Sequence, residues 1–315
     1  MLFKMTTYFV RRLLQMIPVL LGISVIVFLL VRLAGDPVLQ LVPDHFTEEQ
    51  IAEIRADYGF DRPIFVQYFD FLIRALQGDF GYSFHNRQPA WDIVVSRLPR
   101  TVQLAGAAVL LSLLMSLPLG IIAALKRNTA IDVLVTSLSV WGRSLPNFWL
   151  GIMFILFFAV NLGWFPVSGT GEFSNRPFIA HLFLPAFTLS FGLTTTLTRL
   201  VRSAMLEVLS EDHVRTARAK GQFENRVVVW HVLRNALIPV VTVLGLQIGW
   251  LLGGAVIVEE VFAWPGIGRL MLSSIVARDN AVVQAALFIS SLIIMMSNLI
   301  VDWSYTFLDP RIRYS

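Results

Sequence analysis

The sequence predicts an all-α integral membrane protein with about six transmembrane helices and a small helical insertion outside the membrane after the first span. Hydrophobic residues make up 56% of the chain and charged residues only 15%, whereas soluble domains carry about 25% charged residues. The apolar residues gather in blocks long enough to cross a hydrocarbon core of about 30 Å at about 1.5 Å per residue. These blocks are residues 13–33, 101–125, 131–162, 180–200, 236–258 and 283–305.

The first block resembles a secretory signal because basic residues precede an apolar run. The run from Leu13 to Leu33 is long, however, and no small-residue cleavage site follows it. We therefore interpret this block as a retained first span.

The third block is too long for a simple crossing and contains Arg143 and Pro146. Because proline removes an amide donor and kinks a helix, we expect a short interfacial stretch followed by a span over residues 146–162. A strict hydropathy count would also allow five or seven spans in the whole chain.

The charges are distributed unevenly between the two sides of the membrane that these spans define. Segments on the side of the N-terminus sum to +9, and segments on the opposite side sum to −5. Lys and Arg in short loops are retained in the cytoplasm, so both termini are expected there. The predicted organisation is a cytoplasmic N-terminus and first span (1–33), an external helical insertion (34–100), a transmembrane core (101–305) with a cytoplasmic loop at about 207–235, and a cytoplasmic tail (306–315).

The external insertion has the pattern of two helices. Thr47 and Gln50 have the spacing of a capping box, and Gly59 provides a stop. A second helix is expected between Pro63 and Gly78, with an apolar stripe formed by Phe65, Tyr68, Phe69, Leu72, Ile73 and Leu76. We interpret the insertion as a cap on the outer ends of the spans, with direct ligand binding as the alternative.

Several kinds of chemistry are missing from the sequence. There is no cysteine, and none of the three lysines (Lys4, Lys126 and Lys220) lies in a Gly-Lys-Ser/Thr phosphate loop. The five histidines lack the spacing of a metal site, and no Gly-x-Ser-x-Gly or His-Glu-x-x-His motif occurs. We therefore expect a non-catalytic chain that binds no cofactor or metal. Its basic residues lie mainly beside the spans, which indicates contact with membrane lipid and not with nucleic acid.

An ion-coupled secondary transporter is the alternative function. Such proteins place ionisable groups at membrane depth, and Arg143 and Asp302 are the candidates here for polar residues of a pathway or of the structure. Each lies near a predicted boundary, where snorkelling toward the interface is a sufficient explanation. The two halves of the chain also show no clear repeat.

The most informative polar segment is Glu207 to Gly221. It predicts a short helix outside the bilayer that Ser210 caps and Gly221 ends, followed by a second helix at about Glu224 to Arg234. The small residues Thr216, Ala217 and Ala219 would let another protein approach the backbone closely. An ordinary basic surface helix is the alternative interpretation.

This segment resembles the EAA loop of permeases in binding-protein-dependent ABC importers, whose pattern is Glu-Ala-Ala-x-x-x-Gly. Arg215 takes the place of the glutamate, and Thr216 and Ala217 take the places of the alanines before Gly221. The variant is similar to that of the peptide/nickel subfamily, as is the block from Leu233 to Pro239. Further similar blocks are Arg11 to Leu14, Gly35 to Pro37, Gly78 to Gly81, Phe148 to Gly151, Trp264 to Arg269 and Asp309 to Arg311.

The resemblance implies a type I ABC importer permease in a bacterial cytoplasmic (inner) membrane. Such a permease pairs with a second, homologous permease, with two cytoplasmic ATPase subunits that carry the ATP and Mg, and with an external solute-binding protein. The implied site is the ATPase-coupling loop, formed by Arg215, Thr216, Ala217, Arg218, Ala219, Lys220 and Gly221. The implied solutes are di- or oligopeptides or related small molecules, among which the sequence does not choose.

Overall fold

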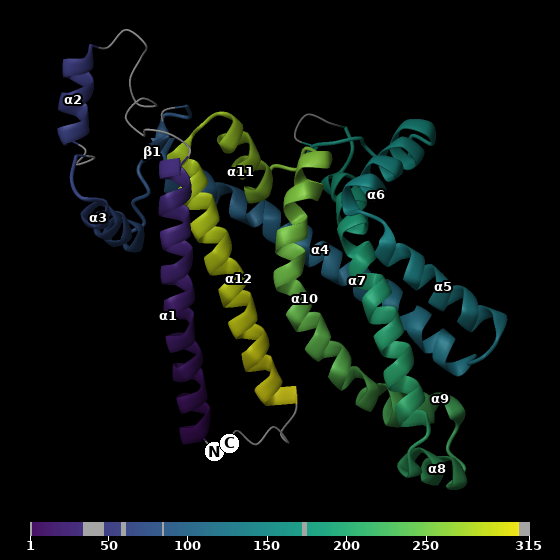
Figure 1. The fold of residues 1–315 in the computed structure, drawn as a ribbon. Helices are drawn as coiled ribbons and strands as arrows, with labels where there is room; N and C mark the ends of the chain where they lie inside the picture. The colour runs from purple at the N-terminus through teal and green to yellow at the C-terminus, as the bar shows by residue number, and fades with distance from the viewer. Residues whose placement is uncertain (1, 34–46, 58–60, 84, 172–174, 309–315) are drawn as a thin grey trace. The chain divides into compact units, whose positions relative to one another are not determined.

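The computed structural model describes residues 2–33, 47–57, 61–83, 85–171 and 175–308 (Figure 1). This part of the chain is almost entirely helical, and its two short strands form one hairpin, β1 (Tyr82–Ser83) antiparallel to β2 (Gln88–Pro89). The chain divides into two compact units. The first comprises Met1–Arg100 and Pro265–Met296, and the second comprises Thr101–Trp264 and Ser297–Ser315.

The first unit contains the hairpin, part of the helices α4 (Ala90–Leu125) and α12 (Asn280–Leu308), and four further helices: α1 (Leu2–Leu33), α2 (Glu48–Asp57), α3 (Ile64–Leu76) and α11 (Ile267–Val276). Its core joins segments that are far apart in sequence. Phe80 and Val94 pack with Val282 and Phe288. Asp279 accepts a hydrogen bond from the Ser83 hydroxyl, which fixes the hairpin to the start of α12.

The two helices expected in the external insertion are present. The capping box is confirmed, because the Thr47 amide donates to the Gln50 side chain at 2.9 Å and the Gln50 amide donates to the Thr47 hydroxyl at 3.4 Å. Gly59 lies outside the described residues. Helix α3 ends before Gly78, whose φ of 78° is left-handed. Much of its apolar stripe is exposed, including Phe65, Phe69, Ile73 and Leu76.

The second unit is a helical bundle arranged along α7 (Phe178–Leu209). Helix α7 packs against α5 (Ala130–Ser144), α6 (Asn147–Phe154) and α10 (Arg234–Val261). The remaining elements are η2 (Ile155–Asn161) and η3 (Val227–Leu233), which are π-helical, and α8 (Asp212–Ala219) and α9 (Glu224–Arg226). In Figure 1, α8 and α9 lie together beyond the C-terminal end of α7.

Close helix packing in this unit depends on glycine. A Cβ at Gly142 of α5 would lie 2.6 Å from the Thr195 methyl group of α7, and a Cβ at Gly120 of α4 would lie 2.7 Å from Val201. Small residues that let backbones approach closely are typical of helix interfaces in membranes. These two glycines therefore set how closely α4 and α5 approach α7.

The exact count of six spans is not confirmed. Four helices of the described residues are long and apolar enough to cross a membrane, and a bent pair raises the number to five. The described apolar part of α1, Leu14–Leu30, is shorter than a full span. The break expected in the third block is present: α5 ends at Ser144, α6 begins at Asn147, and the two directions differ by 106°.

Candidate coupling loop and polar helix junction

Helix α8 is held to the rest of the bundle by two apolar side chains. Val214 and Ala217 are buried and belong to the same core cluster as Val227, Val228 and Val232 of η3. The other residues of α8 are exposed. A helix of eight residues is too short to be stable alone in water, so this packing is what maintains it.

The end of α8 has the geometry that the sequence predicts. Gly221 has a left-handed φ of 73°. Its amide donates to the Arg218 carbonyl at 2.9 Å, and the Gln222 amide donates to the Ala217 carbonyl at 3.4 Å. These two bonds define a Schellman motif, in which glycine avoids the steric cost of a Cβ.

The start of α8 differs from the prediction. Ser210 does not cap this helix, because it lies at the C-terminus of α7 and its hydroxyl donates to the Glu207 carbonyl at 2.7 Å. Glu211 occupies the N-cap position and makes no side-chain capping bond. Ser and Glu are adjacent here, so the sequence alone placed the boundary one residue too early.

Polar contacts fasten both ends of the loop. At the start of α8, the His213 ring lies 2.9 Å from the Glu211 carboxylate and 3.3 Å from the His231 carbonyl. At its end, Arg218 donates to the Glu224 carboxylate at 2.6 and 3.1 Å. This bonding raises the pKa of the Arg218 side chain. The His231 ring contacts the Gln222 side chain at 2.9 Å.

The predicted docking face needs one correction. Ala217 was expected on the surface that another protein approaches, but its side chain faces its own bundle and is only 4% exposed. The exposed residues of the predicted loop are Arg215, Thr216, Arg218, Ala219, Lys220 and Gly221. Beside them Phe223 is 85% exposed and Trp230 is 64% exposed. Neither aromatic residue was singled out from the sequence, because single apolar residues in a polar loop carry no distinctive pattern.

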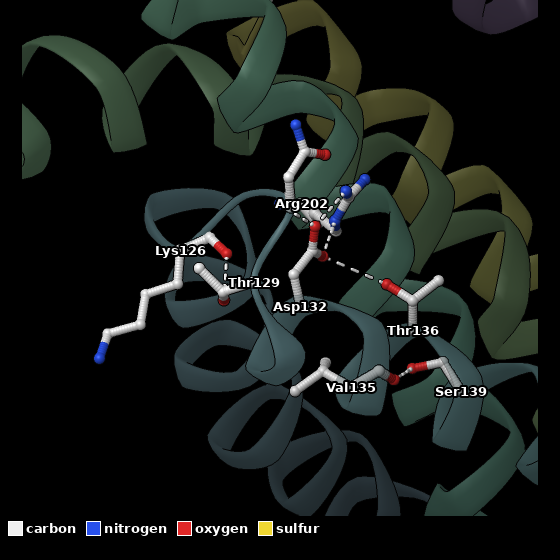
Figure 2. Close-up of polar contacts among 8 residues, drawn as sticks. Lys126, Thr129, Asp132, Val135, Thr136, Ser139 and Arg202 are labelled. Carbon is white, nitrogen blue, oxygen red and sulfur yellow. Dashed lines mark hydrogen bonds and ion pairs between the residues drawn. The ribbon is translucent and has the colours of Figure 1, made fainter.

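An ion pair with a buried carboxylate joins α5 to α7 (Figure 2). Arg202 donates to the two carboxylate oxygens of Asp132 at 2.5 and 2.7 Å. Asp132 also accepts from the Asn128 amide at 2.9 Å and from the Thr136 hydroxyl at 3.4 Å. A buried carboxylate is tolerated when it is paired and hydrogen-bonded in this way. The pair thus connects the turn before α5 to α7.

A hollow of about 480 Å³ lies next to this ion pair, lined by residues of α5, α7 and α10. Arg143, a candidate polar residue from the sequence, lines it together with Arg199 and Arg202. The second candidate, Asp302, is in α12, and its side chain lies outside the described part of the chain. Within the described residues no group of His, Asp and Glu could hold a metal ion.

The pairing of Asp132 with Arg202 could not be predicted from the sequence. The two residues are 70 positions apart, and only their presence within or beside apolar blocks marks them as unusual. Arg199 is marked as unusual only in the same way, because it stands at the end of an apolar block. Only the packing of α5 on α7 brings these charges together.

The helices and the polar residues among them define a multi-spanning helical membrane protein. Residues 116–314 match the family described as "Binding-protein-dependent transport system inner membrane component", and residues 5–105 match the N-terminal domain described for the same kind of component. The chain therefore belongs to the family of binding-protein-dependent transport system inner membrane components.

Curated relatives match the chain over nearly its whole length. It is 42% identical to the oligopeptide transport system permease protein AppB of Bacillus subtilis (strain 168), over 98% of this chain and 100% of the relative. It is also 42% identical to the glutathione transport system permease protein GsiC of Escherichia coli (strain K12), with the same coverage.

Solved structures share the fold. The chain aligns with an inward-facing structure of the MetNI methionine ABC transporter with a TM-score of 0.58 and 20% identity, over 69% of this chain and 96% of that chain. At this identity the match shows the fold alone, which is that of an ABC importer permease.

These findings confirm the main interpretation of the sequence. The chain is the membrane-spanning permease subunit of a transport system that depends on a binding protein. Members of this family are transport subunits, so the expectation of a non-catalytic chain is also confirmed. An ion-coupled secondary transporter is not supported.

Proposed function

We propose that this chain forms the translocation pathway of an ATP-driven importer for peptides, in a bacterial cytoplasmic membrane with both termini in the cytoplasm. The observation that carries the proposal is the loop formed by α8 and η3 in a chain of this family. The names of the relatives AppB and GsiC, which specify oligopeptide and glutathione transport, support a peptide as the solute.

The assembled importer would contain a second, homologous permease, two ATPase subunits that hold ATP and Mg, and an external solute-binding protein. The segment Arg215 to Gly221 would couple this permease to an ATPase subunit. Phe223 would be the apolar anchor of that contact, because a large exposed aromatic beside a polar rim is the usual composition of an interface hot spot.

The packing supports a mechanical route from this loop to the membrane. Only Ser210 and Glu211 separate α8 from α7, and the apolar contacts of Val214 and Ala217 connect α8 to η3. Because η3 continues directly into α10, a displacement of α8 would move α7 and α10 together. The ion pair between Asp132 and Arg202 would pass this movement on to α5.

The first test compares the isolated chain with the assembled system in proteoliposomes. We expect the purified permease alone to hydrolyse no ATP, because its sequence lacks a phosphate loop. The complete complex with its binding protein should hydrolyse ATP and accumulate a labelled peptide only when ATP is present. Peptide accumulation driven by a proton or sodium gradient without ATP would contradict the proposal.

A further inference from the structure

The hollow between α5, α7 and α10 is lined by several positively charged side chains. Arg143, Arg199 and Arg202 all line it, and no acidic residue is among the described residues that do so. Arg202 is neutralised by Asp132. The hollow therefore carries two positive charges in excess.

Arg143 and Arg199 contribute no polar contact within the described part of the chain. Neither has an ion pair or hydrogen bond to any residue in the part of the chain that the structure describes, and both are exposed. Arg199 lies about 15 Å along α7 from its end at Leu209, at about 1.5 Å per residue. Arginines within or at the edge of a membrane segment normally face a water-filled cavity or the interior of the bundle, and they often mark the route of a solute.

Most hydroxyl groups that line the hollow already donate hydrogen bonds to their own helices, so arginine side chains are the main donors left for a ligand. Thr195 and Thr196 both donate to the Gly192 carbonyl, and Ser139 donates to the Val135 carbonyl. Their protons are therefore committed to the helix backbone. As far as the described residues go, the groups that can donate into the hollow are the guanidinium groups of Arg143 and Arg199, the N–H groups of Arg202 that do not bond to Asp132, and the Ser203 hydroxyl.

We propose that this hollow is a transient binding site for the carboxylate of the solute on its way through the permease. A carboxylate accepts two parallel hydrogen bonds from a guanidinium, and a peptide has at least its C-terminal carboxylate. The hollow thus recognises the negative charge that all unmodified peptides share, with no requirement on their side chains. This inference rests on the proposed transport of peptides.

The natural absence of cysteine provides a direct test. Ser203→Cys places a single thiol at the edge of the hollow, next to the proposed site. In the assembled permease–ATPase complex without binding protein, the rate at which a small thiol reagent labels this chain would be measured with trialanine, trialanine amide or inorganic phosphate added. We expect trialanine to slow the labelling several-fold and its amide, which lacks the carboxylate, to have little effect.

The arginines are then tested in the same background. Adding Arg143→Gln or Arg199→Gln should weaken protection by trialanine about tenfold, the effect of losing one charge-assisted hydrogen bond. Arg127→Gln, which removes an exposed arginine from the turn between α4 and α5, should leave protection unchanged. Arg199→Lys should retain part of it, because the positive charge remains.

The outcomes separate the alternatives. Equal protection by trialanine and its amide, or no protection by either, would overturn the proposal, and this comparison needs no arginine variant to fold. Protection by phosphate but not by trialanine would also overturn it and would assign the hollow to a phosphate, such as that of a lipid headgroup. Because labelling requires no transport, it is independent of the uptake experiment that tests the proposed function.

Discussion

Single residues at the contact between α5 and α7 meet two different requirements: the two helices must approach closely, and the charge of a buried carboxylate must be neutralised. Gly142 leaves room for the Thr195 methyl group, while ten positions away on α5 Asp132 balances the charge of Arg202. The polar pair fixes the register of the two helices, since a carboxylate without its partner would be buried and unpaired. The glycine fixes their separation.

The glycine requirement leads to a prediction for Gly142→Ala. Alanine normally stabilises a helix interior by about 0.5–1 kcal/mol relative to glycine, but overpacking a close contact costs about 1–3 kcal/mol. The Thr195 methyl group at 2.6 Å belongs to a stiff, β-branched side chain, so the overpacking term should prevail. We expect the purified permease in detergent to unfold at a lower temperature.

The matched control for this change is Gly192→Ala in α7. A Cβ at Gly192 meets nothing within 4 Å, so this variant should be as stable as the wild type or slightly more stable. Equal unfolding temperatures for Gly142→Ala and the wild type would show that α5 can move away from α7 without cost.

At the scale of the element, local sequence signals predicted much of the structure. The capping box at Thr47 and Gln50, the break near Pro146 and the left-handed end of α8 at Gly221 all depend on neighbouring residues, and all three are present. The sequence wrongly predicted that Ala217 is exposed, because its burial depends on contacts with η3, a separate segment. The ion pair between Asp132 and Arg202 was missed for the same reason.

Helix α8 provides the second prediction, for Gly221→Val. A β-branched residue with a left-handed φ costs about 1–2 kcal/mol, although a Cβ at Gly221 would meet no atom of this chain within 4 Å. The strain should loosen the Schellman motif and shift the exposed Phe223. We expect normal insertion into the membrane but strongly reduced peptide uptake by the assembled complex.

Gly169→Val is the control, because Gly169 also has a left-handed φ, of 80°, with nothing within 4 Å of a Cβ. It lies in the loop between η2 and α7, away from α8. The same backbone strain there should leave uptake nearly unchanged. Wild-type uptake by Gly221→Val would show that α8 is an ordinary surface helix.

At the scale of the whole molecule, the proposed orientation in the membrane rests on charge. The segments predicted on the two sides sum to +9 and −5, and short basic loops remain in the cytoplasm. This orientation places α2 outside and the loop of α8 and α9 inside, where an ATPase subunit could reach it.

Two single-cysteine variants test the orientation, and the absence of native cysteine makes them easy to interpret. Glu49→Cys lies on the exposed surface of α2, and Asn225→Cys lies on the exposed surface of α9. An impermeant thiol reagent added to spheroplasts should label the first variant and leave the second unlabelled until the membrane is disrupted. Inverted vesicles should give the opposite result. Labelling of both positions from the same side would rule out this orientation, and with it the contact between α8 and a cytoplasmic ATPase.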